Sequence, residues 1–321
     1  MLGLAAAALL TALPALADNY LPAWAFGGFV RPEGVNPLIK PRTDTSFPCP
    51  MRGKTVEWEC ADTFNPAAVE KDGKICILYR AEDDPKAGIG GRTSRIGYAE
   101  SADGIHIDRR QATPVFYPDG SDISRTYEWK GGCEDPRVVA ANVKGKTLYV
   151  MTYTAWNNRT PRLAIATSTD LQHWTKHGPA LLNAYNGKFK DLACKSGSIV
   201  TEVVNGKQVA AKVKVNGKKK YLMYWGEQWV CAATSDDLVN WTPYVDENQN
   251  LVYLVTPREG YFDSMLTECG PPAVKTSDGI ILFYNGKNDS GAKADAAYPL
   301  NTYAAGQILF SNDNPLQVKA R

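Results

Sequence analysis

The stretch Leu163-Ala164-Ile165-Ala166-Thr167-Ser168-Thr169-Asp170-Leu171-Gln172-His173-Trp174 decides the fold, because its pattern recurs along the chain. A short apolar strand is followed by a polar turn that contains Ser and Asp. The same turn occurs at Ser101-Ala102-Asp103-Gly104, at Ser235-Asp236-Asp237-Leu238 and, in a weaker form, at Ser311-Asn312-Asp313, so successive copies are 67, 67 and 76 residues apart. A fixed period of this kind indicates a repeat architecture.

Each repeat contains two further strands ahead of this turn. The stronger one is rich in β-branched and aromatic residues and is bounded by Gly, Lys and Asp, which is typical of a strand between tight turns. These strands are predicted at Ile75–Tyr79, Leu148–Tyr153, Tyr221–Trp225 and Ile280–Tyr284. Another strand is predicted to begin shortly before each of them, at 65–69, 135–139, 196–200 and 271–274.

Each unit is therefore predicted to be a meander of four short strands, which is the size of one β-propeller blade with long loops. No convincing amphipathic helix interrupts the pattern. The fold class is predicted to be all-β, a five-bladed β-propeller with its last blade missing or incomplete in this chain. Four repeats are visible, and either the segment Asp18–Trp58 supplies much of a fifth blade or the sequence is C-terminally truncated, which is the interpretation we favour.

The N-terminus is predicted to be a secretory signal peptide over residues 1–17. Leu2 to Leu16 is apolar, and Ala15-Leu16-Ala17 has the small-x-small form of a cleavage site. The alternative is a buried N-terminal helix. With no second long apolar run, we expect an exported protein, periplasmic or extracellular, whose residues 18–321 form a single domain without a membrane span.

Composition excludes several classes of function. The formal net charge is only +2, which gives no sign of a nucleic-acid or membrane-surface partner. Seven Cys without a CxxC pair and only three His argue against a metal site, and no cofactor is expected. A disulfide between Cys49 and Cys60 remains open. Eight Trp and sixteen Tyr suit sugar binding, although most aromatic residues of an all-β protein pack between sheets.

Polar residues gather where the blades begin. The first strand of each propeller blade lines the central channel, so side chains at the starts of these strands should converge on one end of it. The residues concerned are Asn65, Glu134, Asp135, Lys195 and Glu268 on first strands, with Arg80, Glu82, Asp83 and Glu227 on second strands, the last beside Trp225 and Trp229. Each alone could be a solvated turn residue. Together they fit glycoside hydrolysis, which needs one carboxylic acid for the leaving oxygen and one carboxylate to activate water.

At these residues the chain resembles glycoside hydrolase family 130. Gly132-Cys133-Glu134-Asp135-Pro136-Arg137-Val138 is similar to that family's Gly-x-Glu-Asp-Pro-Arg motif, and 63–69 with 78–83 and 94–104 resembles its first blade. The resemblance implies a five-bladed propeller that acts on β-mannosides, either as an inverting phosphorylase or as a β-1,2-mannosidase. It also implies that Asp135 is the acid, in phosphorylases by way of the mannose 3-hydroxyl, and that Asn65 and Arg80 contact the sugar.

Residues of the third blade predict whether the chain resembles the phosphorylases or the hydrolases of the family. Phosphorylases of the family hold phosphate there with a His-Arg pair, whereas this chain has Tyr224-Trp225-Gly226-Glu227. Glu227 with Glu268 resembles the pair that activates water in the β-1,2-mannosidases. We therefore expect an exo-acting, inverting hydrolase of β-1,2-linked manno-oligosaccharides, with a β-mannoside phosphorylase or a non-catalytic carbohydrate-binding propeller as alternatives. The expected substrate contacts are Asn65, Arg80, Asp83, Arg137, Lys195 and Trp229.

Overall fold

A computed structural model describes residues 21–27, 29–88 and 90–321, so the predicted signal peptide at 1–17 lies outside the described residues. The chain divides into two units, residues 1–36 and 37–321. Every described helix and strand belongs to the second unit. The following description concerns that unit.

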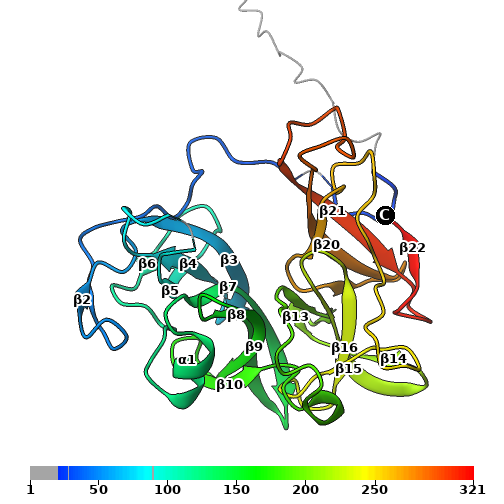
Figure 1. Cartoon of the computed structure of the whole chain (residues 1–321), viewed down its shortest axis with the longest axis horizontal. Coiled ribbons are helices and arrows are strands. Elements are labelled where there is room, and N and C mark those ends of the chain that lie inside the picture. Colours follow the sequence, from blue (N-terminus) through cyan, green and yellow to red (C-terminus); the bar gives the residue numbers. More distant parts are fainter. Residues whose placement is uncertain (1–20, 28, 89) are drawn as a thin grey trace, which may run out of the picture. The chain divides into compact units, whose positions relative to one another are not determined.

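Antiparallel meanders, which we call blades 1 to 4, account for most of the strands and follow one another from blue to red in Figure 1. Blade 1 consists of β3 (Asp62–Lys71), β4 (Lys74–Glu82), β5 (Ser94–Ser101) and β6 (Arg109–Arg110). Blade 2 consists of β7 (Gly132–Val143), β8 (Lys146–Trp156), β9 (Pro161–Ser168) and β10 (Thr175–Pro179).

Blade 3 consists of β11 (Gly197–Ile199) with β14 (Lys212–Val215), β15 (Lys218–Trp225), β16 (Cys231–Ser235) and β17 (Thr242–Pro243). Blade 4 consists of β18 (Leu266–Cys269) with β19 (Val274–Lys275), β20 (Ile280–Lys287), β21 (Tyr303–Phe310) and β22 (Val318–Ala320). The four predicted second strands are confirmed as parts of β4, β8, β15 and β20. The described chain is nearly all-β and propeller-like, as expected.

Tight turns set the register between the first and second strands of the blades. Asp72-Gly73, Lys144-Gly145 and Asn216-Gly217 each place two successive residues at positive φ, from 47° to 80°. This is the type I′ geometry, whose twist matches that of the flanking strands. The register follows directly, with Lys71 opposite Lys74 in blade 1 and Val143 opposite Lys146 in blade 2.

The repeated Ser-Asp turn has a hydrogen-bond pattern that explains its recurrence. In blade 2 the Ser168 hydroxyl accepts the backbone N–H groups of Asp170 and Leu171 and donates to the Asp170 carboxylate. The same carboxylate accepts the N–H groups of Gln172 and His173. The two side chains thereby satisfy the backbone donors of the turn, which would otherwise depend on water.

A hairpin that the sequence analysis missed interrupts the first strand of blade 3. After β11 the chain leaves the blade as β12 (Thr201–Val204) and β13 (Lys207–Ala210), turns at Asn205-Gly206, and returns as β14. β13 pairs in parallel with β7 of blade 2, beside which it lies in Figure 1, and β12 pairs in parallel with β19 of blade 4. The hairpin therefore joins two blades that are not neighbours in sequence.

The core lies between successive blades. In β4 alternate side chains face opposite ways, as the pleat requires. Cys76 and Leu78 pack with Val138 and Met151 of blade 2. The intervening Ile77 and Tyr79 belong to a separate buried cluster. Equivalent clusters join blade 2 to blade 3 and blade 3 to blade 4.

The segment ahead of blade 1 covers that blade's other face. It contains only β1 (Phe47–Cys49) and β2 (Lys54–Val56), and Phe47 and Trp58 pack on Ile77 and Tyr79. Residues 37–58 thus form a two-stranded cover rather than most of a fifth blade. The described helices are short, α1 (Asp122–Tyr127) and the 3₁₀ turn η1 (Ala184–Gly187). All seven cysteines, each of them described, are free thiols.

Candidate active site

Breaks in the first strands turn polar side chains out of the blades. Asn65 and Asp135 sit at bulges in β3 and β7, with φ of 44° and 50°. Such left-handed backbone is most accessible to Gly, Asn and Asp. Each is followed by proline, which is tolerated at a bulge because no ladder hydrogen bond is lost there. In blade 3 Ser196 has the corresponding conformation, with φ of 63°, just before β11. A bulge re-aims a side chain, and this aligns the three residues at one end of the first strands.

Arg80 joins the carboxylates of blades 1 and 2. Its guanidinium donates to Asp135 Oδ1 over 3.0 Å, to Glu134 Oε1 over 2.9 Å and to Glu82 Oε1 over 2.6 Å. Asn65 Nδ2 also donates to Asp135 Oδ1, over 2.8 Å. Arg80 and Asp135 are both almost fully buried, at 6% and 5% exposure. We call these five residues the Asp135 cluster. Burial makes such charge-assisted bonds stronger than they would be at the surface.

The two adjacent carboxyls of this cluster titrate in opposite directions. Burial favours the neutral form of Asp135, but the nearby Arg80 and the hydrogen bond from Asn65 outweigh it, so the pKa of Asp135 is lowered. Burial, assisted by the charge of Asp135, raises the pKa of Glu134 to about 7, although Arg80 acts against this. At neutral pH the cluster therefore holds an ionised Asp135 beside a Glu134 that still carries a proton part of the time.

A second group of charges comes from blades 3 and 4. Lys195 Nζ lies 2.8 Å from Glu227 Oε1, and the Ser196 hydroxyl donates to Glu268 Oε1 over 2.6 Å. Arg137 NH2 lies 3.6 Å from Glu268 Oε1. Glu227 is the most open of these residues, with 44% of its side chain exposed. Its carboxylate is accessible to solvent or substrate.

Arg137 connects the two groups. It follows Asp135 on β7 of blade 2, and its guanidinium donates to the backbone carbonyls of Cys269 and Gly270 in blade 4, over 2.8 Å each. It also donates to the carbonyl of Asp135 itself. Arg137 thus fixes the position of the Asp135 backbone relative to the end of β18, where Glu268 lies.

Lys195 pairs with Glu227, one of the three predicted catalytic carboxylates. Burial would lower the pKa of this amine, but the charges of Glu227, Glu268 and Asp135 outweigh burial and raise it. The structure links the three carboxylate residues through cations, because Lys195 pairs with Glu227 while Arg137 contacts Glu268 and the backbone carbonyl of Asp135. Of the predicted substrate contacts, it places Asn65, Arg80, Arg137 and Lys195 in the same group.

Two predicted substrate contacts lie elsewhere. Asp83 is buried behind the site, where its carboxylate pairs with Arg95 at 3.1 Å and Arg52 at 3.4 Å and accepts the backbone N–H of Thr93. These partners give it a supporting position. Trp229 is 37% exposed and packs against Tyr253, with ring centroids 4.6 Å apart and the ring planes tilted by 34°. The pair forms an aromatic surface beside Glu227.

Some members of the site were not assigned by sequence reasoning. Glu82 and Glu134 were placed near the channel mouth but given no role, and only the bonds to Arg80 reveal one. Ser196 could have been found from its place in the repeat, which matches Asn65 and Asp135. Tyr253 lies in the irregular segment after β17 and carries no pattern that would mark it.

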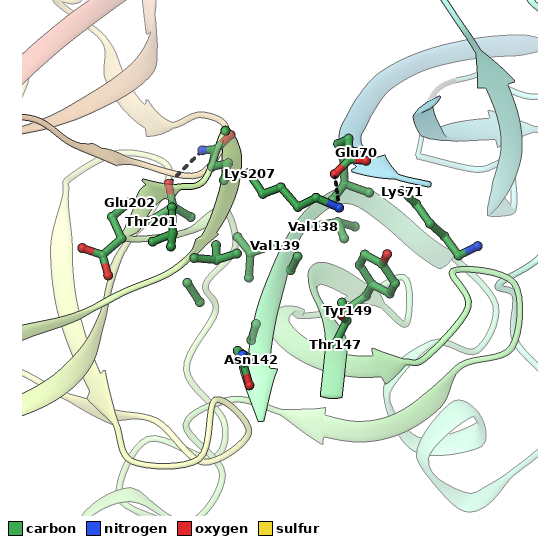
Figure 2. A pocket seen from close by; sticks show the side chains of 18 of the residues that line it. Glu70, Lys71, Val138, Val139, Asn142, Thr147, Tyr149, Thr201, Glu202 and Lys207 are labelled. Carbon is green, nitrogen blue, oxygen red and sulfur yellow. Dashed lines mark hydrogen bonds and ion pairs between the residues drawn. The ribbon is translucent and has the colours of Figure 1, made fainter. Parts of the chain in front are cut away.

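One cavity lies apart from this cluster. It measures about 920 Å³ and lies between the far halves of β3 and β7 and the β12–β13 hairpin. Figure 2 shows Lys207 of the hairpin reaching Glu70 of blade 1 across it, at 3.4 Å, with Tyr149 nearby. None of the predicted site residues lines it. The buried and shifted carboxyls, rather than volume, identify the candidate active site.

Among the described residues, no group of three or more His, Cys, Asp or Glu side chains is arranged to hold a metal ion. No helix in the described ranges has the length and apolar character needed to cross a bilayer.

Comparison with known proteins agrees with the motif at 132–138. A family model described as "beta-1,4-mannooligosaccharide phosphorylase", that of glycoside hydrolase family 130, matches residues 36–321. A 1,2-beta-oligomannan phosphorylase from Thermoanaerobacter sp. (strain X514) is 31% identical over 288 residues, which are 88% of this chain and 81% of that protein.

Solved structures are similar at higher identity. A glycosyl hydrolase from Bacteroides ovatus is 57% identical, with a TM-score of 0.89 over 94% of this chain and 81% of that one. Another structure is 60% identical, with a TM-score of 0.89 over 94% and 82% of the two chains. It is described by the words "The GH130 family of mannoside phosphorylases contains glycoside hydrolases that target beta-1,2 mannosidic linkages in Candida mannan". With a family model that covers nearly the whole of unit 37–321 and these relatives, the chain belongs to glycoside hydrolase family 130.

Proposed function

We propose that this protein is an exo-acting hydrolase that releases mannose from β-1,2-linked manno-oligosaccharides with inversion at the anomeric carbon. It belongs to a family that acts on β-mannosides, and the proposal concerns the linkage and the acceptor, water rather than phosphate. The similarity at 60% identity to a structure described with β-1,2-mannosidic hydrolases supports the linkage.

The charge balance of the site is the main observation in favour of water, rather than phosphate, as the acceptor of the mannosyl group. Each cation there is already paired: Arg80 with three carboxylates, Lys195 with Glu227, and Arg137 with backbone carbonyls and Glu268. Carboxylates outnumber cations, so a phosphate dianion would meet net negative charge at close range. Such repulsion is worth several kcal/mol where solvation is poor, roughly 4 kcal/mol for unit charges at 4 Å and an effective dielectric of 20.

The proposed roles follow from the positions of the groups. Asp135 acts as the acid. Because it is ionised in the resting site, it first takes the proton of Glu134, whose pKa is about 7 and which binds the same Arg80 guanidinium, and then passes that proton to the leaving oxygen. Glu227, paired with Lys195, and Glu268, bound by Ser196 and Arg137, activate the attacking water. Inversion requires acid and base on opposite sides of the sugar with room for that water.

The remaining polar groups bind the sugar. Asn65 and Arg80 contact the mannose that is cleaved, as the family resemblance implies. Arg137 and Lys195 hold the carboxylates in position and offer further donors to hydroxyls. Trp229 offers a flat apolar face to a sugar ring.

A phosphorylase is the second candidate, and a specific comparison favours it. The curated relative at 31% identity is a 1,2-beta-oligomannan phosphorylase, and Lys195 and Arg137 could change partners to bind phosphate. A carbohydrate-binding propeller without catalysis is the third candidate. All three act on the same class of ligand.

Product analysis separates these candidates. The enzyme is incubated with β-1,2-mannobiose in ¹⁸O-labelled water, with and without inorganic phosphate. We expect mannose labelled at the anomeric oxygen, formed at a rate independent of phosphate. Mannose 1-phosphate as the main product would overturn the hydrolase in favour of the phosphorylase, and binding without any product would leave the non-catalytic propeller.

Two further proposals concern the whole chain. We propose that residues 1–17 direct export and are removed, which N-terminal sequencing of the exported protein would test. We also propose that the propeller has five blades, which a crystal structure of the protein would test.

A further inference from the structure

Blades 1, 2 and 4 contain the same buried ionic group. In each, a fully buried carboxylate from the loop before the first strand accepts a hydrogen bond from a tyrosine of the second strand. The same carboxylate pairs with a cation at or just after the fourth strand. The groups are Glu59–Tyr79–Arg110, Glu128–Tyr153–Lys176 and Asp263–Tyr284–Arg321.

Blade 3 has a tryptophan where the tyrosine would be. Trp225 pairs with Cys231, four residues before Ser235 of the repeated turn. Tyr153 pairs with Ala164, four residues before Ser168, so the two aromatics occupy equivalent places in their blades.

The cation is absent from blade 3 as well. Ala166 of blade 2 faces Lys176 on the fourth strand, whereas the equivalent Ala233 of blade 3 faces Pro243. No charged side chain from the fourth strand can therefore reach the centre of this blade.

An open pocket replaces the ionic group. It has a volume of about 220 Å³. We call it the blade 3 pocket, and its lining includes Cys194, Lys195, Trp225, Glu227, Trp229 and Tyr253. Trp225 is 3% exposed, and its indole N–H has no hydrogen-bond partner in the described part of the chain. A buried donor without an acceptor costs about 1–3 kcal/mol, so an acceptor is expected from a bound molecule.

The lining fits one sugar ring. Pockets for drug-sized ligands measure roughly 300–1,000 Å³, so a smaller one suits a single ring rather than a chain. Trp229 and Tyr253, 37% and 48% exposed, offer aromatic faces for the C–H side of a pyranose. The Trp225 N–H and the Lys195 amine can donate to hydroxyl oxygens, and the Glu227 carboxylate can accept from one.

We propose that the blade 3 pocket binds a second pyranose ring of the substrate, next to the ring held at the Asp135 cluster. The inference rests on the proposed action on β-mannosides but not on whether water or phosphate is the acceptor. The pocket shares Glu227 and Lys195 with the catalytic group, so a sugar there is adjacent to the reacting centre.

Two substitutions test the pocket. Trp225→Phe removes only the N–H, and Trp229→Ala removes the exposed aromatic face. KM is measured, with phosphate present, for β-1,2-mannotriose and for 4-nitrophenyl β-mannoside, which has a single sugar ring. We expect Trp225→Phe to raise the ratio of the two KM values about 2–13-fold, the equivalent of one neutral hydrogen bond. We expect Trp229→Ala to raise it by at least as much.

Controls make the result decisive. Tyr261→Ala removes an exposed aromatic ring from the loop before blade 4 and should leave the KM ratio as in the wild type. Calorimetry measures the affinity for mannotriose of the Asp135→Asn variant and of the Asp135→Asn, Trp225→Phe double variant. This repeats the comparison in proteins that do not turn over the substrate. If the KM ratio and the affinity for mannotriose stay unchanged in both pocket variants, the inference about the blade 3 pocket is overturned while the proposed function stands. Failure of the wild-type protein to turn over or bind any β-mannoside would overturn the proposed function, and the inference with it.

Discussion

Asn65 and Asp135, on the first strands of adjacent blades, share a 2.8 Å hydrogen bond, and both have left-handed backbone followed by proline. The bond orients the Asp135 carboxylate and adds to the charge of Arg80, against burial, in lowering its pKa. Because an amide donor stabilises the ionised form, Asn65 controls how readily Asp135 gives up a proton.

We expect Asp135→Asn to lower kcat about 10²–10⁴-fold on β-1,2-mannobiose, the usual value of general acid catalysis. The amide keeps the shape of the side chain but cannot donate the proton, so KM should change little. Steady-state kinetics with the natural substrate measure this. A variant that retains more than a tenth of wild-type kcat would rule Asp135 out as the acid.

Glu227→Gln and Glu268→Gln should each lower kcat by a similar factor, and the double variant should lose little more than either alone. Both carboxylates are proposed to act on one water, and effects on a shared step do not add. A double-mutant cycle measures the coupling. Azide, a small anionic nucleophile, should partly rescue these variants but not Asp135→Asn. Near wild-type turnover in both single variants would show that the pair does not activate water.

The pH profile should depend on Glu134. Its pKa is raised to about 7, so the free enzyme loses the reserve proton as pH rises through 7. We expect kcat/KM, which reports groups of the free enzyme, to fall above pH 7. Glu134→Gln keeps the hydrogen-bond acceptor for Arg80 but cannot titrate, so its profile should lack this limb. An unchanged alkaline limb in Glu134→Gln would assign it to another group.

The same shift has a consequence for stability. The folded pKa of Glu134 lies above the unfolded value of about 4.3, so the folded state binds the proton more tightly. Its contribution to the free energy of unfolding therefore falls as pH rises from about 4.3 to 7 and is constant above that. Urea titrations of the wild type and Glu134→Gln between pH 4.5 and 7.5 should differ in slope over this window.

Blades 2 and 3 should lose different amounts of stability when the second-strand donor is removed. Tyr153→Phe leaves one oxygen of the fully buried Glu128, Oε1, without its donor, while Lys176 still binds the other, and should destabilise the fold by about 1–3 kcal/mol. Trp225→Phe removes a donor that has no protein partner, so only the smaller ring should reduce stability. Urea unfolding at pH 7 compares them. Equal losses, after allowance for ring volume, would show that blade 3 has an internal acceptor.

Local signals made most of the fold predictable. The Ser-Asp turn and the aromatic strand are encoded within a few residues, so each blade could be placed before any contact was known. The β12–β13 hairpin was missed because no strand was predicted between residues 200 and 221, and the hairpin occupies 201–210. Asn205-Gly206, a strong two-residue turn signal, was present and would have marked it.

The site was predictable only in part. Asp135, Glu227 and Glu268 could be grouped because repeat position places them at one end of the blades. Asp83 could not be distinguished from Glu82 in the sequence, because the choice depends on which carboxylate faces Arg80 and which faces Arg95. Tyr253 depends on the path of an irregular loop, for which no periodicity exists.

The inserted hairpin also bears on the order of folding. Thr201 donates through its hydroxyl to the carbonyl of Ala273, a residue 72 positions later, while β13 needs β7, which comes much earlier in the chain. Contacts between residues so far apart in sequence form slowly, because the entropy cost of closing the loop comes before the contacts contribute any favourable free energy. Blades 2 and 4 must both exist before the hairpin can dock between them. Its amides should therefore be among the last to gain protection from hydrogen exchange during refolding.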